Sequence, residues 1–184
     1  MERKTQAFAV WITGLPASGK STIATALSAE LASHGIDSAT LESDALRPIV
    51  APHPRYDEEG RDEFYRALVY IGVLLTTHGV PVIFDATASR RAYRNGARTQ
   101  IPRFLEIFVD CPLEVCMRRD PKGIYRKGKE GKASSVPGLQ VPYEPPENPD
   151  VILRCGVERP EAGVRKIIST LLQKQFIQPR LESK

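Results

Sequence analysis

Residues 14–21 read Gly-Leu-Pro-Ala-Ser-Gly-Lys-Ser, and this stretch decides the fold. It fits G-x-x-x-x-G-K-[ST], the phosphate-binding loop of nucleotide-binding enzymes. An apolar run that suits a buried strand precedes it at residues 7–13, and apolar residues at helical spacing follow it in residues 22–34. Backbone N–H groups of such a loop and the N-terminus of the following helix together bind phosphate oxygens. The alternative, an ordinary glycine turn capped by a serine, leaves the strand and the helix unexplained.

The loop residues each have an expected role in binding ATP and Mg²⁺. Lys20 would reach the β- and γ-phosphates, and the hydroxyl of Ser21 would bind Mg²⁺. The residues predicted to contact ATP are Gly14, Leu15, Pro16, Ala17, Ser18, Gly19, Lys20, Ser21 and Thr22. The sequence therefore predicts ATP and Mg²⁺ as cofactors.

Composition is that of one ordinary globular domain, which we expect to cover residues 1–184. A net charge of +4 suits anionic small molecules as well as nucleic acid. The three cysteines are sparse and lack metal-ligand spacing, which predicts free, buried thiols in a reducing compartment. The apolar run at residues 7–12 is too short for a signal peptide or a membrane span. We therefore expect a cytoplasmic protein without membrane association.

Apolar runs alternate with helical patterns along the chain, which predicts an α/β fold with a parallel sheet. The expected strands are residues 7–13, 38–42, 80–85, 104–109 and 151–153. The expected helices are residues 22–34, 58–78, 112–119 and 160–176, with a basic helix or turn at 90–98. Pro48, Pro52 and Pro54 are expected to break the chain after the second strand, and residues from about 177 to 184 are expected to fray.

Residues 120–149, called the lid segment below, are rich in Gly, Pro, Lys and Ser and show no core periodicity. A segment of this kind in a compact domain is either disordered or a functional lid. Its cations and those just before it are Arg118, Arg119, Lys122, Lys127, Lys129 and Lys132. Such cations, closing over phosphates, would exclude water and stabilise transition-state charge. A solvated basic loop is the alternative.

Carboxylates follow two of the expected strands, where ligands bind in open α/β sheets. Asp44 follows the second strand and suits a general base or a group that orders Mg²⁺, with Arg47 one helical turn further on. A helix cap at Ser43 or Asp44 is the alternative. Asp85 ends the third strand, where it could order Mg²⁺ through water or serve only as a turn residue.

Three arginines in the basic segment, Arg91, Arg94 and Arg98, recur at helical spacing and share one face. Facing a pocket, they would bind anionic groups, as would Arg61 and Arg66 on the long helix. The alternative is a solvated basic face.

Six motifs together resemble the adenylylsulfate kinase (APS kinase) family of P-loop kinases, which phosphorylate the 3′-hydroxyl of adenosine 5′-phosphosulfate (APS) with MgATP. The motifs are residues 14–22, Glu42-Ser43-Asp44-x-x-Arg47, Arg61-Asp62-Glu63, and residues 111–116, 119–125 and 142–146. The resemblance spans residues 7–172. It implies a three-layer P-loop kinase fold, with a parallel five-stranded sheet, helices on both faces and a mobile lid. It also implies a homodimer that acts on a small anionic substrate, with no nucleic acid as partner.

The resemblance also assigns roles to individual residues. It makes Lys20, Asp44, Arg119 and Lys122 catalytic, and Ser21 and Asp44 the residues that hold the metal. The residues it places at the acceptor are Glu42, Asp44, Arg47, Tyr56, Arg61, Phe64, Lys122 and Val136.

Departures from the family pattern fall almost entirely at the acceptor. Phe64 stands where the family usually has Asn, and Val136 stands where it has a Phe that stacks on the acceptor adenine. Losing one stacking partner should cost about 1–3 kcal/mol of acceptor binding. A kinase of this fold with another acceptor therefore stays an alternative: another nucleotide-linked oxoanion, a small alcohol or a nucleic-acid end. A regulatory nucleotide-binding module is a third hypothesis, which the intact Lys20, Ser21 and Asp44 disfavour.

Overall fold

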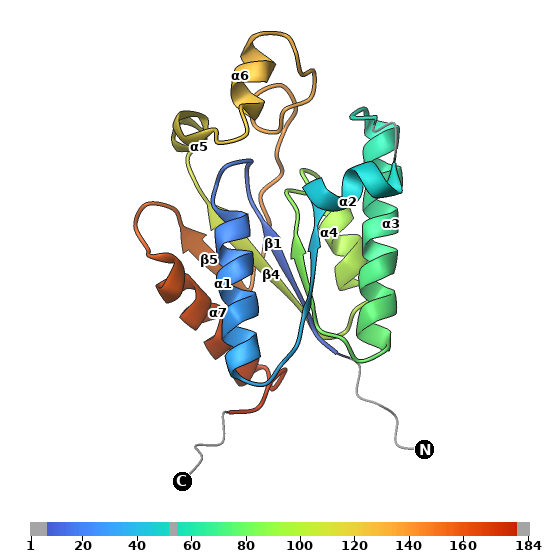
Figure 1. The fold of residues 1–184 in the computed structure, drawn as a ribbon, viewed down its shortest axis with the longest axis vertical. Coiled ribbons are helices and arrows are strands. Elements are labelled where there is room, and N and C mark those ends of the chain that lie inside the picture. Colours follow the sequence, from blue (N-terminus) through green and yellow to red (C-terminus); the bar gives the residue numbers. More distant parts are fainter. Residues whose placement is uncertain (1–6, 52–54, 180–184) are drawn as a thin grey trace.

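The computed structural model describes residues 7–51 and 55–179 of the chain. One sheet of five parallel strands has the order β2-β3-β1-β4-β5 (Figure 1). The strands are β1 (Ala9–Thr13), β2 (Ala39–Glu42), β3 (Val82–Asp85), β4 (Phe104–Asp110) and β5 (Val151–Arg154). The helices are α1 (Lys20–Ser33), α2 (Ser43–Val50), α3 (Glu58–Thr77), α4 (Arg91–Arg98), α5 (Leu113–Arg119), α6 (Ile124–Lys129) and α7 (Pro160–Gln173). The predicted α/β fold with a five-stranded parallel sheet is confirmed.

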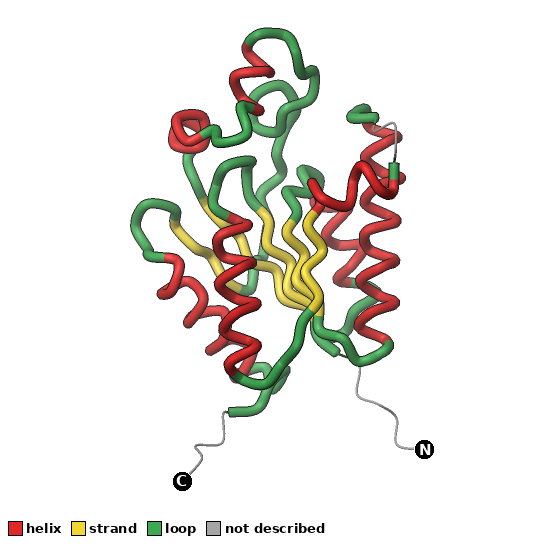
Figure 2. Tube along the Cα trace, viewed as in Figure 1, coloured by secondary structure: helices red, strands yellow, loops and turns green. Residues whose placement is uncertain are grey.

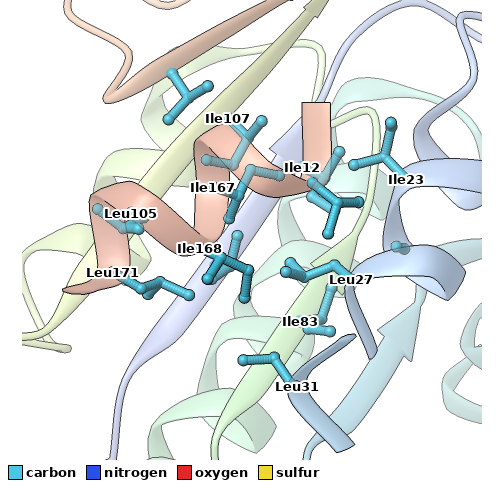
Figure 3. Close-up of a cluster of buried hydrophobic side chains, with 14 of the residues drawn as sticks. Ile12, Ile23, Leu27, Leu31, Ile83, Leu105, Ile107, Ile167, Ile168 and Leu171 are labelled. Carbon is cyan, nitrogen blue, oxygen red and sulfur yellow. The ribbon is translucent and has the colours of Figure 1, made fainter. Parts of the chain in front are cut away.

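Helices cover both faces of the sheet, which gives the predicted three layers (Figures 1 and 2). Strand β1 is buried along its whole length and alternates between two cores. Val10 and Ile12 contribute to the core under α1 and α7, and Figure 3 shows Ile12 in this cluster with Leu27 and Ile167. Trp11 points to the opposite core, under α3 and α4, where it stacks on Phe84 with ring centroids 4.4 Å apart.

Parallel register aligns the carboxyl ends of the central strands at one edge of the sheet. Ile12 of β1 and Glu42 of β2 both pair with Asp85 of β3, so the loop after β1 begins beside both carboxylates. Helices α5 and α6 lie beyond this edge, at the top of Figure 1. The fold therefore collects the phosphate-binding loop, two acidic strand ends and the lid segment in one place.

The lid segment is ordered, so the expectation of a structureless segment is wrong. It contains α6, and Tyr125 and Val136 are buried in a third small core with Cys111 and Cys116. The Tyr125 hydroxyl donates a hydrogen bond to the carbonyl of Pro16 in the phosphate-binding loop, over 3.0 Å. The apolar residues of this segment have no regular period because they converge on the loop rather than on one face of a helix or strand. The mobility of the lid stays a prediction.

Two further expectations need correction. Pro48 lies inside α2 and does not end it. Ile177 is 5% exposed and belongs to the core under α1 and α7, so the expected frayed tail cannot begin there. Pro52, Pro54 and residues 180–184 lie outside the described residues. In the described part of the chain, no helix has the length and hydropathy needed to cross a bilayer.

Candidate active site

The phosphate-binding loop joins β1 to α1 and needs its glycines. A Cβ on Gly14 would lie 2.6 Å from the carbonyl oxygen of Val109, so only glycine permits this approach of the loop to β4. Ala17 and Gly19 have φ values of 61° and 108°, in the left-handed region. The turn ends at Lys20, the first residue of α1, as the motif requires.

Lys20 is a nearly buried cation, 8% exposed. Its Nζ donates a hydrogen bond to the Leu15 carbonyl over 2.9 Å, which holds the side chain across the loop. Burial lowers the pKa of Lys20, and the negative charges of Asp85 and Asp44 act in the opposite direction. A phosphate group at the loop would supply negative charge that stabilises the protonated form of Lys20.

The first cavity, about 380 Å³ in volume, lies at this edge of the sheet. It is lined by the loop, the start of α2, the end of β3 and the start of the lid segment. All four predicted catalytic residues line it: Lys20, Asp44, Arg119 and Lys122. The predicted metal ligand Ser21 lines it too, as do Pro16, Ala17, Gly19, Thr22 and Glu42.

Asp44 and Lys122 join the lid segment to the start of α2. The Nζ of Lys122 donates to Oδ2 of Asp44 over 2.7 Å and lies 3.8 Å from Oε1 of Glu42. The hydrogen bond to Asp44 is the main cause that raises the pKa of Lys122. Glu42, not Ser43 or Asp44, is the N-cap of α2, and no side chain caps that helix. The helix-cap alternative for Asp44 is therefore wrong, and its carboxylate is available to other partners.

The cavity offers oxygen ligands suited to Mg²⁺. Ser21, Asp44 and Asp85 line it, and magnesium in nucleotide enzymes takes few protein ligands, several waters and the substrate phosphates. Among the described residues, no group of three or more His, Cys, Asp or Glu side chains could hold a metal by itself. The donor set fits an ion shared with ATP rather than one held by the protein alone.

Two arginines beyond Asp44, Arg47 and Arg61, form a basic corner, called the acceptor site below after its predicted role. Arg47 is 9% exposed, and its Nη1 has no hydrogen-bond partner. Arg61 donates to Oγ of Ser89 over 3.3 Å and to Oγ of Ser135 in the lid segment over 3.1 Å. Burial lowers the pKa of Arg61, and the like charge of Arg47 adds to that effect. Neither arginine has a carboxylate partner among the described ion pairs, so the corner carries excess positive charge.

Not every residue predicted to contact the acceptor is accessible to a ligand. Phe64 is 1% exposed and Val136 is 3% exposed, so neither offers a surface on which an adenine could stack. The guanidinium of Arg47 lies over the Phe64 ring instead, 3.8 Å from its centroid. Tyr56 is 52% exposed and is the predicted acceptor aromatic that remains accessible.

The arginines of α4 do not form the anion-binding or solvated face expected of them. Arg94 is buried, and its Nε donates to Oε1 of Glu106 over 2.6 Å. Arg98 bonds the other oxygen of Glu106 over 2.9 Å, and Arg91 pairs with Glu147. These cations are neutralised by carboxylates from β4 and from the end of the lid segment, which the helical spacing alone does not reveal. Arg66 is exposed and lines neither cavity.

A second cavity, about 510 Å³ in volume, was missed by the sequence analysis. It lies on the other side of the phosphate-binding loop and shares Gly19, Thr22 and Arg119 with the first cavity. Residues 153–160 line it, from the end of β5 through the connection to the first residue of α7. The signal for it was the carboxyl end of β5, since parallel strands place ligands at that edge.

Comparisons with known proteins agree with this arrangement. The family model for adenylylsulphate kinase matches residues 6–154. The adenylyl-sulfate kinase of Microcystis aeruginosa (strain NIES-843 / IAM M-2473) is 38% identical over 174 residues, covering 95% of this chain and 96% of that protein. A probable bifunctional SAT/APS kinase 2 of Sorangium cellulosum is 35% identical, over 94% of this chain but only 30% of that longer protein.

A solved structure is similar over the same length. The Mycobacterium tuberculosis APS kinase CysC, in complex with AMPPNP and APS, superposes with a TM-score of 0.85 at 32% identity. The match covers 90% of this chain and 98% of that one. With the phosphate-binding loop, the acidic strand ends and the lid segment already assembled at one edge of the sheet, these matches show that the chain belongs to the adenylylsulphate kinase family.

Proposed function

We propose that this chain transfers the γ-phosphoryl group of ATP to the 3′-hydroxyl of APS, giving 3′-phosphoadenosine 5′-phosphosulfate and ADP. The observation that carries the proposal is the position of Asp44. It lines the first cavity together with the phosphate-binding loop, and Arg47 of the acceptor site follows one turn later in α2. The relatives named adenylyl-sulfate kinase support the choice of APS over other acceptors.

The donor would occupy both cavities. Its β- and γ-phosphates would bind at the loop, where no carboxylate of the described residues is in hydrogen-bond contact with Lys20. Its nucleoside would extend past Gly19 and Thr22 into the second cavity, which the same two residues line. The negative charge of the ATP phosphates would favour the protonated form of Lys20, which burial disfavours.

Magnesium would be held by Ser21 together with the phosphates of ATP, with Asp44 ordering the ion from the same cavity wall. The ion supplies neutralisation of the charge on the β- and γ-phosphate oxygens. Arg119 and Lys122, at the start of the lid segment, line the same cavity and would add positive charge as the transferred group moves.

Asp44 would accept the proton of the acceptor. The 3′-oxygen forms a bond to the γ-phosphorus, the bond from that phosphorus to the β–γ bridging oxygen breaks, and the hydroxyl proton passes to the Asp44 carboxylate. Lys122 bonds Oδ2 of Asp44 over 2.7 Å, so Oδ1 would be the oxygen that takes the proton. Arg47 and Arg61 would bind the anionic phosphosulfate, and Tyr56 would stack on the adenine.

The test is MgATP-dependent phosphorylation of APS by the purified chain, followed by coupled ADP release. Lys20→Ala should abolish turnover, and Asp44→Asn should lower kcat at least about 100-fold. Asp37→Asn, an exposed carboxylate away from both cavities, is the matched control and should retain wild-type turnover. ATP binding without any APS-dependent ADP release would overturn the proposal, and an unchanged kcat in Asp44→Asn would overturn the role of Asp44.

We further propose that the chain acts as one domain, as a homodimer, in the cytoplasm. The single sheet supports one domain. Tyr70 and Leu74, one turn apart on α3, are 68% and 47% exposed and would suit an interface. All three cysteines are free, which fits a reducing compartment. Light scattering at micromolar concentration tests the dimer directly, and a monomer mass would refute it.

A further inference from the structure

We propose that Phe64 is a positioning residue, whose ring holds the guanidinium of Arg47 so that its free edge meets the oxoanion of the acceptor. This inference rests on the proposed function, because the oxoanion is then the phosphosulfate of APS. Phe64 itself is 1% exposed, so it can act on the acceptor only through Arg47.

The geometry is that of a cation held against an aromatic wall. The central carbon of the Arg47 guanidinium lies 3.8 Å from the centroid of Phe64, and 5.3 and 5.8 Å from those of Tyr56 and Tyr65. The negative face of an aromatic ring attracts a guanidinium at such distances, most strongly where water is excluded. Phe64 makes the shortest of these contacts.

Arg47 needs such a support because no carboxylate among the described residues neutralises its charge. It is nine-tenths buried, and among the described residues no ion pair joins it to a carboxylate. Arg61 is close enough for the two positive charges to repel, since Arg47 contributes to lowering the pKa of Arg61. The Phe64 ring therefore supplies an attraction that keeps two cations near each other in the absence of an anion.

The unsatisfied donor of Arg47 indicates what the corner binds. Nη1 is buried without a hydrogen-bond partner, and a buried charged donor left unpaired is costly. Phe64 covers one face of the guanidinium, so an oxoanion would have to bind at its edge, where the guanidinium donors match the paired oxygens of a sulfate or phosphate group. The family pattern has Asn at position 64, which could hydrogen-bond an acceptor directly, whereas this chain replaces that contact by an aromatic support beneath Arg47.

The variant Phe64→Leu removes the ring and keeps an apolar side chain. We expect the Kd and KM for APS to rise about 2- to 30-fold, the range that loss of a cation–π contact predicts, with the KM for ATP changed less than about twofold. Phe104→Leu is the matched control. Phe104 is buried in the same core, and its ring lies 5.1 Å from the guanidinium of Arg98, away from the acceptor.

The experiment measures APS binding by calorimetry, steady-state kinetics with each substrate varied, and the melting temperature of each variant. Phe64→Met, which fills a core more flexibly, replaces Phe64→Leu if that variant does not fold. An unchanged APS affinity in the Phe64 variants overturns the inference, as does an equal loss in Phe104→Leu. Wild-type chain that binds APS without phosphorylating it overturns the proposed function, while the ratio of the two Kd values still decides the role of Phe64. Wild-type chain that does not bind APS overturns both.

Discussion

Replacing Arg94 by Met should destabilise the protein severely, although Arg94 lines neither cavity. The side chain is 1% exposed and bonds three segments at once. Nε donates to Glu106 over 2.6 Å, Nη2 donates to the Glu144 carbonyl over 2.6 Å, and Nη1 donates to the Ala88 carbonyl. The variant leaves the buried Glu106 carboxylate and two carbonyls without these donors.

The size of the stability loss in Arg94→Met depends on which charged partner stays buried. Breaking a buried ion pair by removing one partner costs about 3–5 kcal/mol, because the other charge stays buried. Arg98 still bonds Glu106 over 2.9 Å, so we expect the lower end, about 3 kcal/mol. For a chain of this length that corresponds to a fall in Tm of about 6–12 °C.

A double-mutant cycle with Glu106→Leu separates the ion pair from general damage. Because an apolar pair can replace a buried ion pair at little net cost, Arg94→Met/Glu106→Leu should lose less than the sum of the two single variants. Arg91→Met is the matched control: its carboxylate partners lie at the surface, and Arg91 is 38% exposed, so its loss should stay below about 1 kcal/mol.

The assay is urea unfolding followed by circular dichroism, with the m-value checked for each variant. Two results would refute the reasoning. A loss in Arg94→Met no larger than that in Arg91→Met would mean that burial of the ion pair adds nothing. Strict additivity in the double variant would mean that Arg94 and Glu106 do not interact energetically.

Two more predictions concern titratable groups. Lys20→Met should raise the stability of the nucleotide-free chain by about 0.5–2 kcal/mol while abolishing stabilisation by ATP, because burial lowers the pKa of Lys20 and so disfavours its charge. Melting curves with and without MgATP test this, and an unchanged or lower Tm without nucleotide would contradict it. Burial raises the pKa of Tyr143 to about 12, so its neutral form stabilises the fold fully below pH 10 and this contribution is lost as pH rises toward 12. Between pH 10 and 12 the free energy of unfolding of Tyr143→Phe should therefore fall by about 1 kcal/mol less per pH unit than that of the wild type. Equal slopes of the two pH profiles would exclude the effect.

The sheet and the phosphate-binding loop were predictable because their signals are local. Residues 14–21 fix a strand, a turn and a helix within one short stretch, and each later strand is a continuous apolar run. The carboxyl-end rule then placed Asp44 and Asp85 at the edge where both line the first cavity. The strand bounds were right within two residues because polar and turn residues flank each run.

The lid segment and α4 were misread because their contacts are distant in sequence. Tyr125 is buried and its hydroxyl bonds the carbonyl of Pro16. The spacing of apolar residues in 120–149 does not indicate that partner. The sequence did hold a signal for the ion pair that α4 makes. Glu106 lies inside the apolar run of β4, where a buried carboxylate needs a partner. Reading that requirement together with the basic helix would have predicted the ion pair of Arg94 and Glu106.

The acceptor site shows why the two departures from the family pattern weaken the assignment less than the sequence suggests. Phe64 and Val136 are buried, so neither adds a new contact to the ligand, and the substitutions act only through the contacts that they remove. The charges that an anionic acceptor would meet are those of Arg47 and Arg61, and within the described part of the chain neither forms an ion pair with a carboxylate. Position 64 can therefore change from an amide to an aromatic ring without moving the site of positive charge, provided the ring stabilises Arg47. The chain can then keep APS as its acceptor although one of the contacts to it has been replaced. The APS affinities of the Phe64 variants decide between this account and a site that has acquired another substrate.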